Sequence, residues 1–205
     1  MSDVKTTLKK ADRTRQQLLE AALRVIGRKG FAAATVDEIV REAGVSKGVA
    51  YYHFKNKESL VENIIAQEIA TIESLLKDVV DREGDPMRAL VSMLQTFAEH
   101  LFDHQDLARL LSTEIWRGGR AWSQQMRSGL QSVIDMVAQE LQRGKEVGTI
   151  REEVDSTFAA ASIVGMVVVD AMYYLDDEGD VRLGHDEFIE RVRNFVHHAL
   201  AVSAA

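Results

Sequence analysis

The chain has 205 residues, no cysteine, 25 Lys and Arg against 32 Asp and Glu, and a net charge of −7. The lack of cysteine excludes a disulfide framework, a thiolate nucleophile and a cysteine-based zinc site. The first ten residues are polar and lack the apolar run of a signal peptide, and the longest uncharged apolar-rich run, residues 156–169, is too short to span a bilayer. We therefore expect a soluble, cytoplasmic protein that needs neither a membrane nor a cofactor.

The charge is unevenly distributed along the chain. Residues 1–57 contain 12 Lys and Arg against 6 Asp and Glu, whereas residues 58–205 contain 13 against 26. A basic segment can neutralise phosphates, and an acidic remainder discourages non-specific binding to DNA. The distribution is therefore compatible with a nucleic-acid partner, although the total charge alone suggests the opposite.

Helical periodicity begins near residue 12. We expect residues 1–11 to form a flexible basic arm, which is either a solvated tail or a source of additional phosphate contacts. Gly30 fits the position after the end of the first helix, where Ile26 and Phe31 would make the hydrophobic contact of a Schellman ending.

Residues 35–57 predict two short helices joined by a tight turn. Thr35 and Glu38 have the spacing of a capping box, in which each side chain satisfies the backbone amide of the other residue. Gly44 supplies the permissive backbone that ends the first helix, and Ser46 is a good N-cap for the second. This is the helix-turn-helix pattern, whose second helix enters the major groove of DNA with its N-terminal residues foremost.

The second helix of this pair carries side chains suited to DNA. Lys47 and Tyr51 lie four residues apart and share one face, and Gly48 lets the backbone approach a phosphate or a base edge closely. A third helix begins after Asn56, where the amides of its first turn and Lys57 make a site for a phosphate.

The run Gly-Val-Ser-Lys-Gly-x-x-Tyr-Tyr-His-Phe-Lys-Asn-Lys-Glu, from Gly44 to Glu58, closely resembles the DNA-binding domain of the TetR (tetracycline repressor) family of bacterial regulators. The resemblance covers roughly residues 12–70. It implies that Thr35 and Tyr52 clamp phosphates and that Lys57 contacts the DNA backbone. The residues that it places on or near the groove are Ser46, Lys47, Gly48, Tyr51 and His53.

The rest of the chain is predicted to be helical throughout, which makes the fold all-α, with about nine helices. A long helix from about residue 57 belongs to both halves of the molecule, so we expect it to transmit movement from one half to the other. We place the domain boundary within it, with a helix-turn-helix domain over 12–60 and an effector-binding and dimerisation domain over 61–205. The later helices are expected at about 86–102, 106–117, 121–144, 154–175 and 186–202.

The last two helices are the candidates for assembly. Residues 158–175 are apolar nearly all round, which indicates burial on more than one side. These helices are either ordinary core or a two-fold interface, and we favour the interface, to which the TetR resemblance also points. Two-fold symmetry suits a palindromic operator. The expected interface residues are Phe158, Ala161, Met166, Met172, Phe188, Val192, Phe195 and Ala199.

A ligand pocket is expected on the middle helices, although the same residues can equally fill a core. Polar residues crowd near two tryptophans there, and a cationic rim on an apolar cavity suits an amphipathic anion such as a fatty acid or an acyl-coenzyme A. Residues 111–117 are also faintly similar to fatty-acid-responsive members of the family. The carboxyl group of Asp170 either finds its hydrogen-bond partners between helices or contacts a polar or basic group of the ligand. The expected pocket residues are Phe97, Leu101, Leu111, Glu114, Ile115, Trp116, Arg117, Trp122, Met126, Met166, Asp170 and Tyr173.

A metal site is the weaker alternative for one pair of histidines. His100 and His104 lie four residues apart, a spacing that can chelate zinc or nickel. No third ligand is evident in the sequence, and histidines at helix ends are commonly just solvated, so we expect no metal.

The sequence thus predicts a homodimeric transcriptional repressor that a small molecule releases from a palindromic, double-stranded DNA operator. The alternatives are an activator or co-regulator of the same fold, responding to a cationic or aromatic compound, and an all-α enzyme. The enzyme is disfavoured, because the chain has no cysteine, no Gly-rich nucleotide loop and no carboxylate pair framed by a nucleophile.

Overall fold

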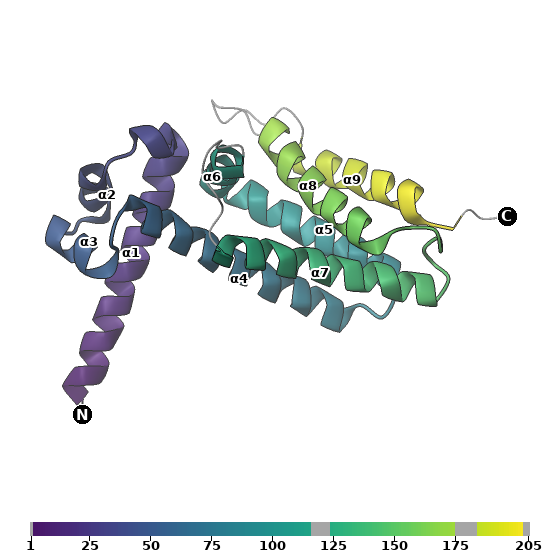
Figure 1. Ribbon diagram of the computed structural model, residues 1–205, viewed down its shortest axis with the longest axis horizontal. Coiled ribbons are helices and arrows are strands. Elements are labelled where there is room, and N and C mark those ends of the chain that lie inside the picture. Colours follow the sequence, from purple (N-terminus) through teal and green to yellow (C-terminus); the bar gives the residue numbers. More distant parts are fainter. Residues whose placement is uncertain (1, 116–123, 175–183, 203–205) are drawn as a thin grey trace.

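The computed structural model describes residues 2–115, 124–174 and 184–202 (Figure 1). Within these ranges the chain forms nine α-helices and no strand, so the predicted all-α fold is confirmed. No helix in these ranges is long and apolar enough to cross a membrane. The helices are α1 (Ser2–Ala33), α2 (Val36–Ala43), α3 (Lys47–His53), α4 (Lys57–Arg82), α5 (Pro86–Asp103), α6 (Gln105–Ile115), α7 (Gln124–Glu146), α8 (Ser156–Tyr174) and α9 (His185–Leu200).

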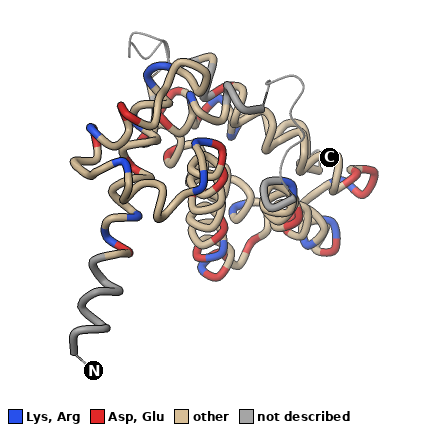
Figure 2. The backbone as a smooth tube through the Cα atoms, turned by 60° about the vertical axis from the view of Figure 1, so that its left-hand side comes forward, with Lys and Arg blue, Asp and Glu red and all other residues tan. Residues whose placement is uncertain are grey.

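The helices fall into two groups joined by α4 (Figure 1). Helices α1 to α3 lie together at one end, and α5, α7, α8 and α9 form a bundle at the other. Lys and Arg are frequent on the N-terminal helices, whereas many Asp and Glu lie near helix ends (Figure 2). The basic N-terminal part identified from the sequence is therefore also a spatial unit.

Two clusters of buried side chains match these two groups, and α4 contributes to both. Its first half supplies Leu60 and Ile64 to the N-terminal cluster, and its second half supplies Ile72 and Leu76 to the bundle. The helix runs without interruption from Lys57 to Arg82. A displacement of α4 in the bundle is therefore transmitted directly to the N-terminal helices.

Helix α6 is a second link between the groups, and the sequence did not indicate it. Leu110 is completely buried and belongs to the N-terminal cluster, although it lies far from α1–α4 in the sequence. At Gly27 of α1, an added Cβ would lie 2.9 Å from the Cα of Asp106. The backbones of α1 and α6 thus meet at a position that only glycine accommodates without displacement.

Two predictions for α1 are wrong. The helix begins at Ser2 rather than near residue 12, because residues 2–11 contain neither Gly nor Pro and continue the helical segment. Gly30 has φ 76° and ψ 157°, which lies outside the left-handed helical conformation of a Schellman ending. The helix is kinked at this glycine instead, although Ile26 and Phe31 are both buried in the same cluster.

Candidate nucleic-acid interface

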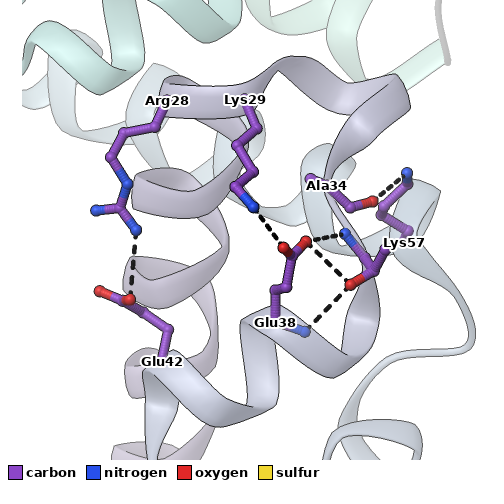
Figure 3. Close-up of polar contacts among 7 residues, drawn as sticks. Arg28, Lys29, Ala34, Glu38, Glu42 and Lys57 are labelled. Atoms are coloured by element: carbon purple, nitrogen blue, oxygen red, sulfur yellow. Dashed lines mark hydrogen bonds and ion pairs between the residues drawn. The ribbon is translucent and has the colours of Figure 1, made fainter.

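The N-terminus of α2 is fixed by the predicted capping box (Figure 3). The Glu38 amide donates to Thr35 Oγ1 at 3.2 Å, and the Thr35 amide donates to Glu38 Oε2 at 3.1 Å. Lys29 of α1 lies 2.5 Å from the other carboxylate oxygen of Glu38. The hydrogen bond from Lys29, followed by that from the Thr35 backbone, lowers the pKa of Glu38 to about 2. Glu38 is therefore ionised, and it holds Thr35 in place at neutral pH.

The turn between α2 and α3 is a Schellman motif. Gly44 has φ 67° and ψ 30°, and its amide donates to the carbonyl of Arg41 at 3.3 Å. The amide of Val45 donates to the carbonyl of Val40 at 3.0 Å, which completes the motif. Ser46 then caps α3 by accepting from the amide of Val49. The predicted roles of Gly44 and Ser46 in building the turn are confirmed.

Helix α3 presents an aromatic face to solvent. The side chains of Tyr51 and Tyr52 are 51 % and 81 % exposed, whereas Ala50 and Phe54 are buried in the N-terminal cluster. Gly48 is exposed, and an added Cβ would meet no heavy atom within 4 Å. Exposed tyrosines combine an apolar ring with a hydroxyl that needs a polar partner, as expected of a contact surface.

Lys47 at the start of α3 is paired with Asp37 of α2. Its ammonium lies 2.7 Å from the Asp37 carboxylate, and this hydrogen bond raises the pKa of Lys47. Both side chains are more than half exposed, so the pair contributes little stability. Asp37 was missed in the sequence, because its position next to Lys47 depends on how α2 and α3 cross.

Lys57, which is expected to contact the DNA backbone, makes contacts within the chain (Figure 3). Its side chain is partly buried, and its ammonium donates to the carbonyls of Phe31 at 2.5 Å and Ala34 at 2.7 Å. The same nitrogen lies 4.2 Å from the centroid of the Phe31 ring. The side chain thus binds the connection between α1 and α2. His53 is also partly buried, with its ring 5.1 Å from that of Tyr52.

Comparison with known proteins agrees with this geometry. A family model described as "Bacterial regulatory proteins, tetR family" matches residues 18–64, and one described as "Tetracyclin repressor-like, C-terminal domain" matches residues 86–199. The chain belongs to the TetR family. This TetR-family regulator is therefore related to DNA-binding proteins over both its helix-turn-helix and its helical bundle, and the sequence-based assignment is confirmed.

Among named relatives, the regulator is 32 % identical over 160 residues to the A-factor receptor protein of Streptomyces griseus. That alignment covers 76 % of this chain but only 52 % of the receptor, so the chain spans about half the length of that relative. It is also 25 % identical over 152 residues to the fatty acid metabolism regulator protein of Bacillus subtilis, covering 74 % and 78 % of the two chains.

Two solved structures are similar to the TetR-family fold seen here. The fatty acid degradation regulator FadR from Bacillus halodurans has a TM-score of 0.82 at 20 % identity, covering 90 % of this chain and 94 % of its own. FadR from Bacillus subtilis, solved in complex with stearoyl-CoA, has a TM-score of 0.79 at 20 % identity, covering 88 % and 96 %. At this identity the likeness establishes the fold alone.

The predicted ligand pocket is only partly covered by the described residues. Phe97 and Leu101 are buried in the bundle core, and Leu111 and Met166 pack against it. Asp170 is partly buried, and this burial raises its pKa, whereas Tyr173 is 63 % exposed. Outside the description lie Trp116, Arg117 and Trp122, together with the side chains of Glu114, Ile115 and Met126.

The predicted assembly residues divide into two groups. Phe158 and Phe195 are 72 % and 62 % exposed, and Ala161 is exposed as well. Phe188 and Val192 are instead buried in the core of their own bundle. Met166 and Ala199 pack against the same core, and the side chain of Met172 lies outside the description.

One exposed residue of this face was missed and another was assigned elsewhere. Val169 is 45 % exposed, and Tyr173, which the sequence assigns to the pocket, is 63 % exposed. Phe158, Ala161, Gly165, Val169 and Tyr173 follow a three-to-four-residue spacing, which places them along one side of α8. This spacing was present in the sequence, but it is hidden because α8 is apolar on its other sides too.

His100 joins α5 to α4. Its ring is buried, and Nε2 lies 3.0 Å from Glu68 Oε2. His104 uses Nδ1 to contact the carbonyl of His100 at 2.8 Å. In the parts of the chain that the structure describes, no three His, Cys, Asp or Glu side chains are grouped to hold a metal ion. The contact with Glu68 gives His100 a role in packing α4 against the bundle.

Proposed function

We propose that this chain is a homodimeric repressor that binds a palindromic double-stranded DNA operator and releases it when an amphipathic acyl compound binds. The observation that carries the proposal is the exposed face of α3, where Lys47, Gly48, Tyr51 and Tyr52 lie together. Lysine can donate to phosphate or to the acceptors of guanine, and tyrosine can contact phosphate or a thymine methyl group. The glycine lets the helix backbone come close to the groove.

Dimer formation is supported by the exposed apolar residues of the last two helices. Phe158, Val169 and Tyr173 lie along one side of α8, and Phe195 is exposed on α9. Exposed aromatic side chains on neighbouring helices are typical of protein interfaces. A two-fold arrangement of these helices would present two copies of α3 to two half-sites of a palindrome.

The oligomeric state can be tested by sedimentation velocity on a Phe158→Glu, Phe195→Glu variant. We expect wild type to be a dimer and this variant a folded monomer, because the two carboxylates would be buried against apolar surface. Val147→Glu is the matched control, since Val147 is 62 % exposed but lies after α7. A folded double variant that stays dimeric would place the interface elsewhere.

An acyl ligand is supported by two independent observations. Most of the described residues of the expected pocket are apolar, with Phe97 and Leu101 on α5 and Leu111 on the neighbouring α6. The fold is similar to that of a regulator solved in complex with stearoyl-CoA. The sequence adds the arginines of residues 117–127, which suit the anionic head of such a compound.

The deciding experiment selects binding sites from a random duplex library and then measures affinity for the recovered site by fluorescence anisotropy. Wild type is expected to recover a palindrome, and Lys47→Ala, Tyr51→Ala should lose the affinity while keeping its fold and dimer. Addition of stearoyl-CoA should release the DNA. Recovery of no sequence would refute the operator, whereas specific binding that stearoyl-CoA leaves unchanged would refute only the acyl ligand.

A further inference from the structure

We infer that Lys57 is a positioning residue, which acts on DNA binding through Thr35 and not by touching a phosphate. Its ammonium fixes the connection between α1 and α2 to the first turn of α4. The inference rests on the proposed DNA-binding function, and it assigns to Lys57 a role different from the backbone contact that the family resemblance implies.

The first support is the geometry of the ammonium group. It has three hydrogens to donate, and two acceptors are already present, the carbonyls of Phe31 and Ala34 at 2.5 and 2.7 Å. The Phe31 ring, 4.2 Å from the nitrogen, adds a cation–π contact. Two of the three hydrogens are thereby engaged, and the third is the only one left for a phosphate, on a side chain that is already partly buried.

The second support is the peptide group that Lys57 holds. The carbonyl of Ala34 and the amide of Thr35 belong to the same planar unit. Lys57 donates to its oxygen, and Glu38 accepts from its nitrogen at 3.1 Å. Lys29 in turn holds Glu38 from the other side (Figure 3). The plane is thereby fixed at both edges, which sets the direction in which the Thr35 side chain leaves the backbone.

The third support is the place of Lys57 in the fold. It is the first residue of α4, the helix that contributes to both buried clusters. A movement of α4 therefore reaches the Ala34–Thr35 peptide through one side chain. By contrast, Lys55 lies two residues earlier in the loop and is exposed, so it is suited to contact a phosphate directly and provides a matched control.

The salt dependence of DNA binding separates the two roles. Removing one lysine that neutralises a phosphate makes the slope of log K against log salt shallower by about 0.9. We expect Lys57→Met to weaken binding to the selected site about tenfold at every salt concentration, with the slope of wild type. Lys55→Met, which removes one such lysine from each protomer of the proposed dimer, should reduce the slope by about 1.8. A Lys57→Met slope reduced by the same amount would overturn the inference.

A double-mutant cycle tests whether Lys57 acts through Thr35. If it does, Lys57→Met should weaken binding in wild type but hardly at all in a Thr35→Ala background. Fully additive effects would overturn the inference. Val79→Ala, a core variant of the bundle, shows whether reduced stability alone lowers the affinity for DNA. We expect Val79→Ala to be less stable than wild type but to bind DNA with unchanged affinity. If Lys57→Met has no cooperative unfolding transition, Lys57→Gln replaces it in each comparison.

A measurement without DNA keeps the inference separate from the proposed function. Hydrogen exchange of the Thr35 amide should accelerate in Lys57→Met and stay unchanged in Lys55→Met, because Lys57 donates to the carbonyl of the Ala34–Thr35 peptide, whereas Lys55 is exposed in the loop. Equal exchange in both variants would refute the positioning role. Failure of wild type to select any site would instead refute the proposed function and leave this result standing.

Discussion

The close approach of α1 and α6 at Gly27 makes the strongest stability prediction. In Gly27→Ala the new Cβ would lie 2.6 Å from Asp106 Oδ1, 2.8 Å from its Cβ and 2.9 Å from its Cα. Carbon atoms in contact normally stay about 3.5–4.0 Å apart. The carboxylate can rotate away, but the Cα belongs to the backbone, so the two helices must separate by roughly 0.5–1 Å.

The size of the effect follows from two opposing contributions. Overpacking of this kind costs about 1–3 kcal/mol, and replacing a glycine inside a helix by alanine returns about 1 kcal/mol. We therefore expect Gly27→Ala to lose about 0–2 kcal/mol. The same change at Gly48, where a Cβ meets no atom within 4 Å, should gain up to about 1 kcal/mol.

The assay is unfolding by urea and by heat, followed by circular dichroism, on wild type and both variants. The two variants should differ by about 1–3 kcal/mol, and each kcal/mol corresponds to about 2–4 °C in Tm for a chain of this length. A Gly27→Ala protein at least as stable as Gly48→Ala would refute the reasoning, because it would mean that α1 and α6 do not meet closely in solution.

Four further predictions concern single side chains. Gly48→Ala, although stable, should bind the selected operator more weakly in the anisotropy assay, because its methyl group lies between α3 and the groove. Leu110→Ala should lose about 2–5 kcal/mol in urea unfolding, since the side chain is completely buried, whereas Leu111→Ala, at a partly buried position, should lose less. Glu38→Gln should be less stable than wild type above the ordinary carboxyl value of 4.5, and the difference should disappear as pH falls through about 2, because the pKa of Glu38 is lowered in the folded chain. Asp170→Asn should be more stable than wild type at neutral pH, because burial raises the pKa of Asp170 and so penalises its ionised form. In urea unfolding, the free energies of unfolding of the two proteins should become equal below pH 3.8.

The opposite outcomes are equally informative. An unchanged stability of Leu110→Ala would mean that α6 does not complete the N-terminal core. A pH-independent difference for Glu38→Gln would remove the Lys29 and Thr35 hydrogen bonds as its cause. A less stable Asp170→Asn at neutral pH would mean that the carboxylate has a partner that stabilises its ionised form.

Local rules predicted the parts of the fold that depend on neighbouring residues. The capping box of Thr35 and Glu38, the glycine turn at Gly44 and the Ser46 cap all form as the sequence indicated. Their partners lie within a few residues, so the spacing alone contains the geometry. The same rules could have predicted the start of α1, because nothing in residues 2–11 breaks a helix. That start was nevertheless missed.

Contacts between distant segments were outside the reach of these rules. The Lys57 side chain and the α1–α2 connection, the pair of Lys47 and Asp37, and the burial of Leu110 all depend on how helices cross. The apolar residues of α9 illustrate the same limit. Their spacing identifies an apolar side of the helix, but it does not distinguish residues that are buried in the core, as at Phe188, from residues that stay exposed, as at Phe195.

The burial of Leu110 also bears on how such regulators can be rearranged. A fragment that stops at the end of α4 would leave the apolar surface of α1 that α6 covers open to water. A fusion of roughly the first 60 residues to a foreign sensor domain would therefore give a poorly folded DNA-binding domain, unless the sensor domain supplies an equivalent of α6. The part of this chain that can be transferred as a folded unit is the helix-turn-helix together with the turn of α6 around Leu110, two segments that are distant in the sequence.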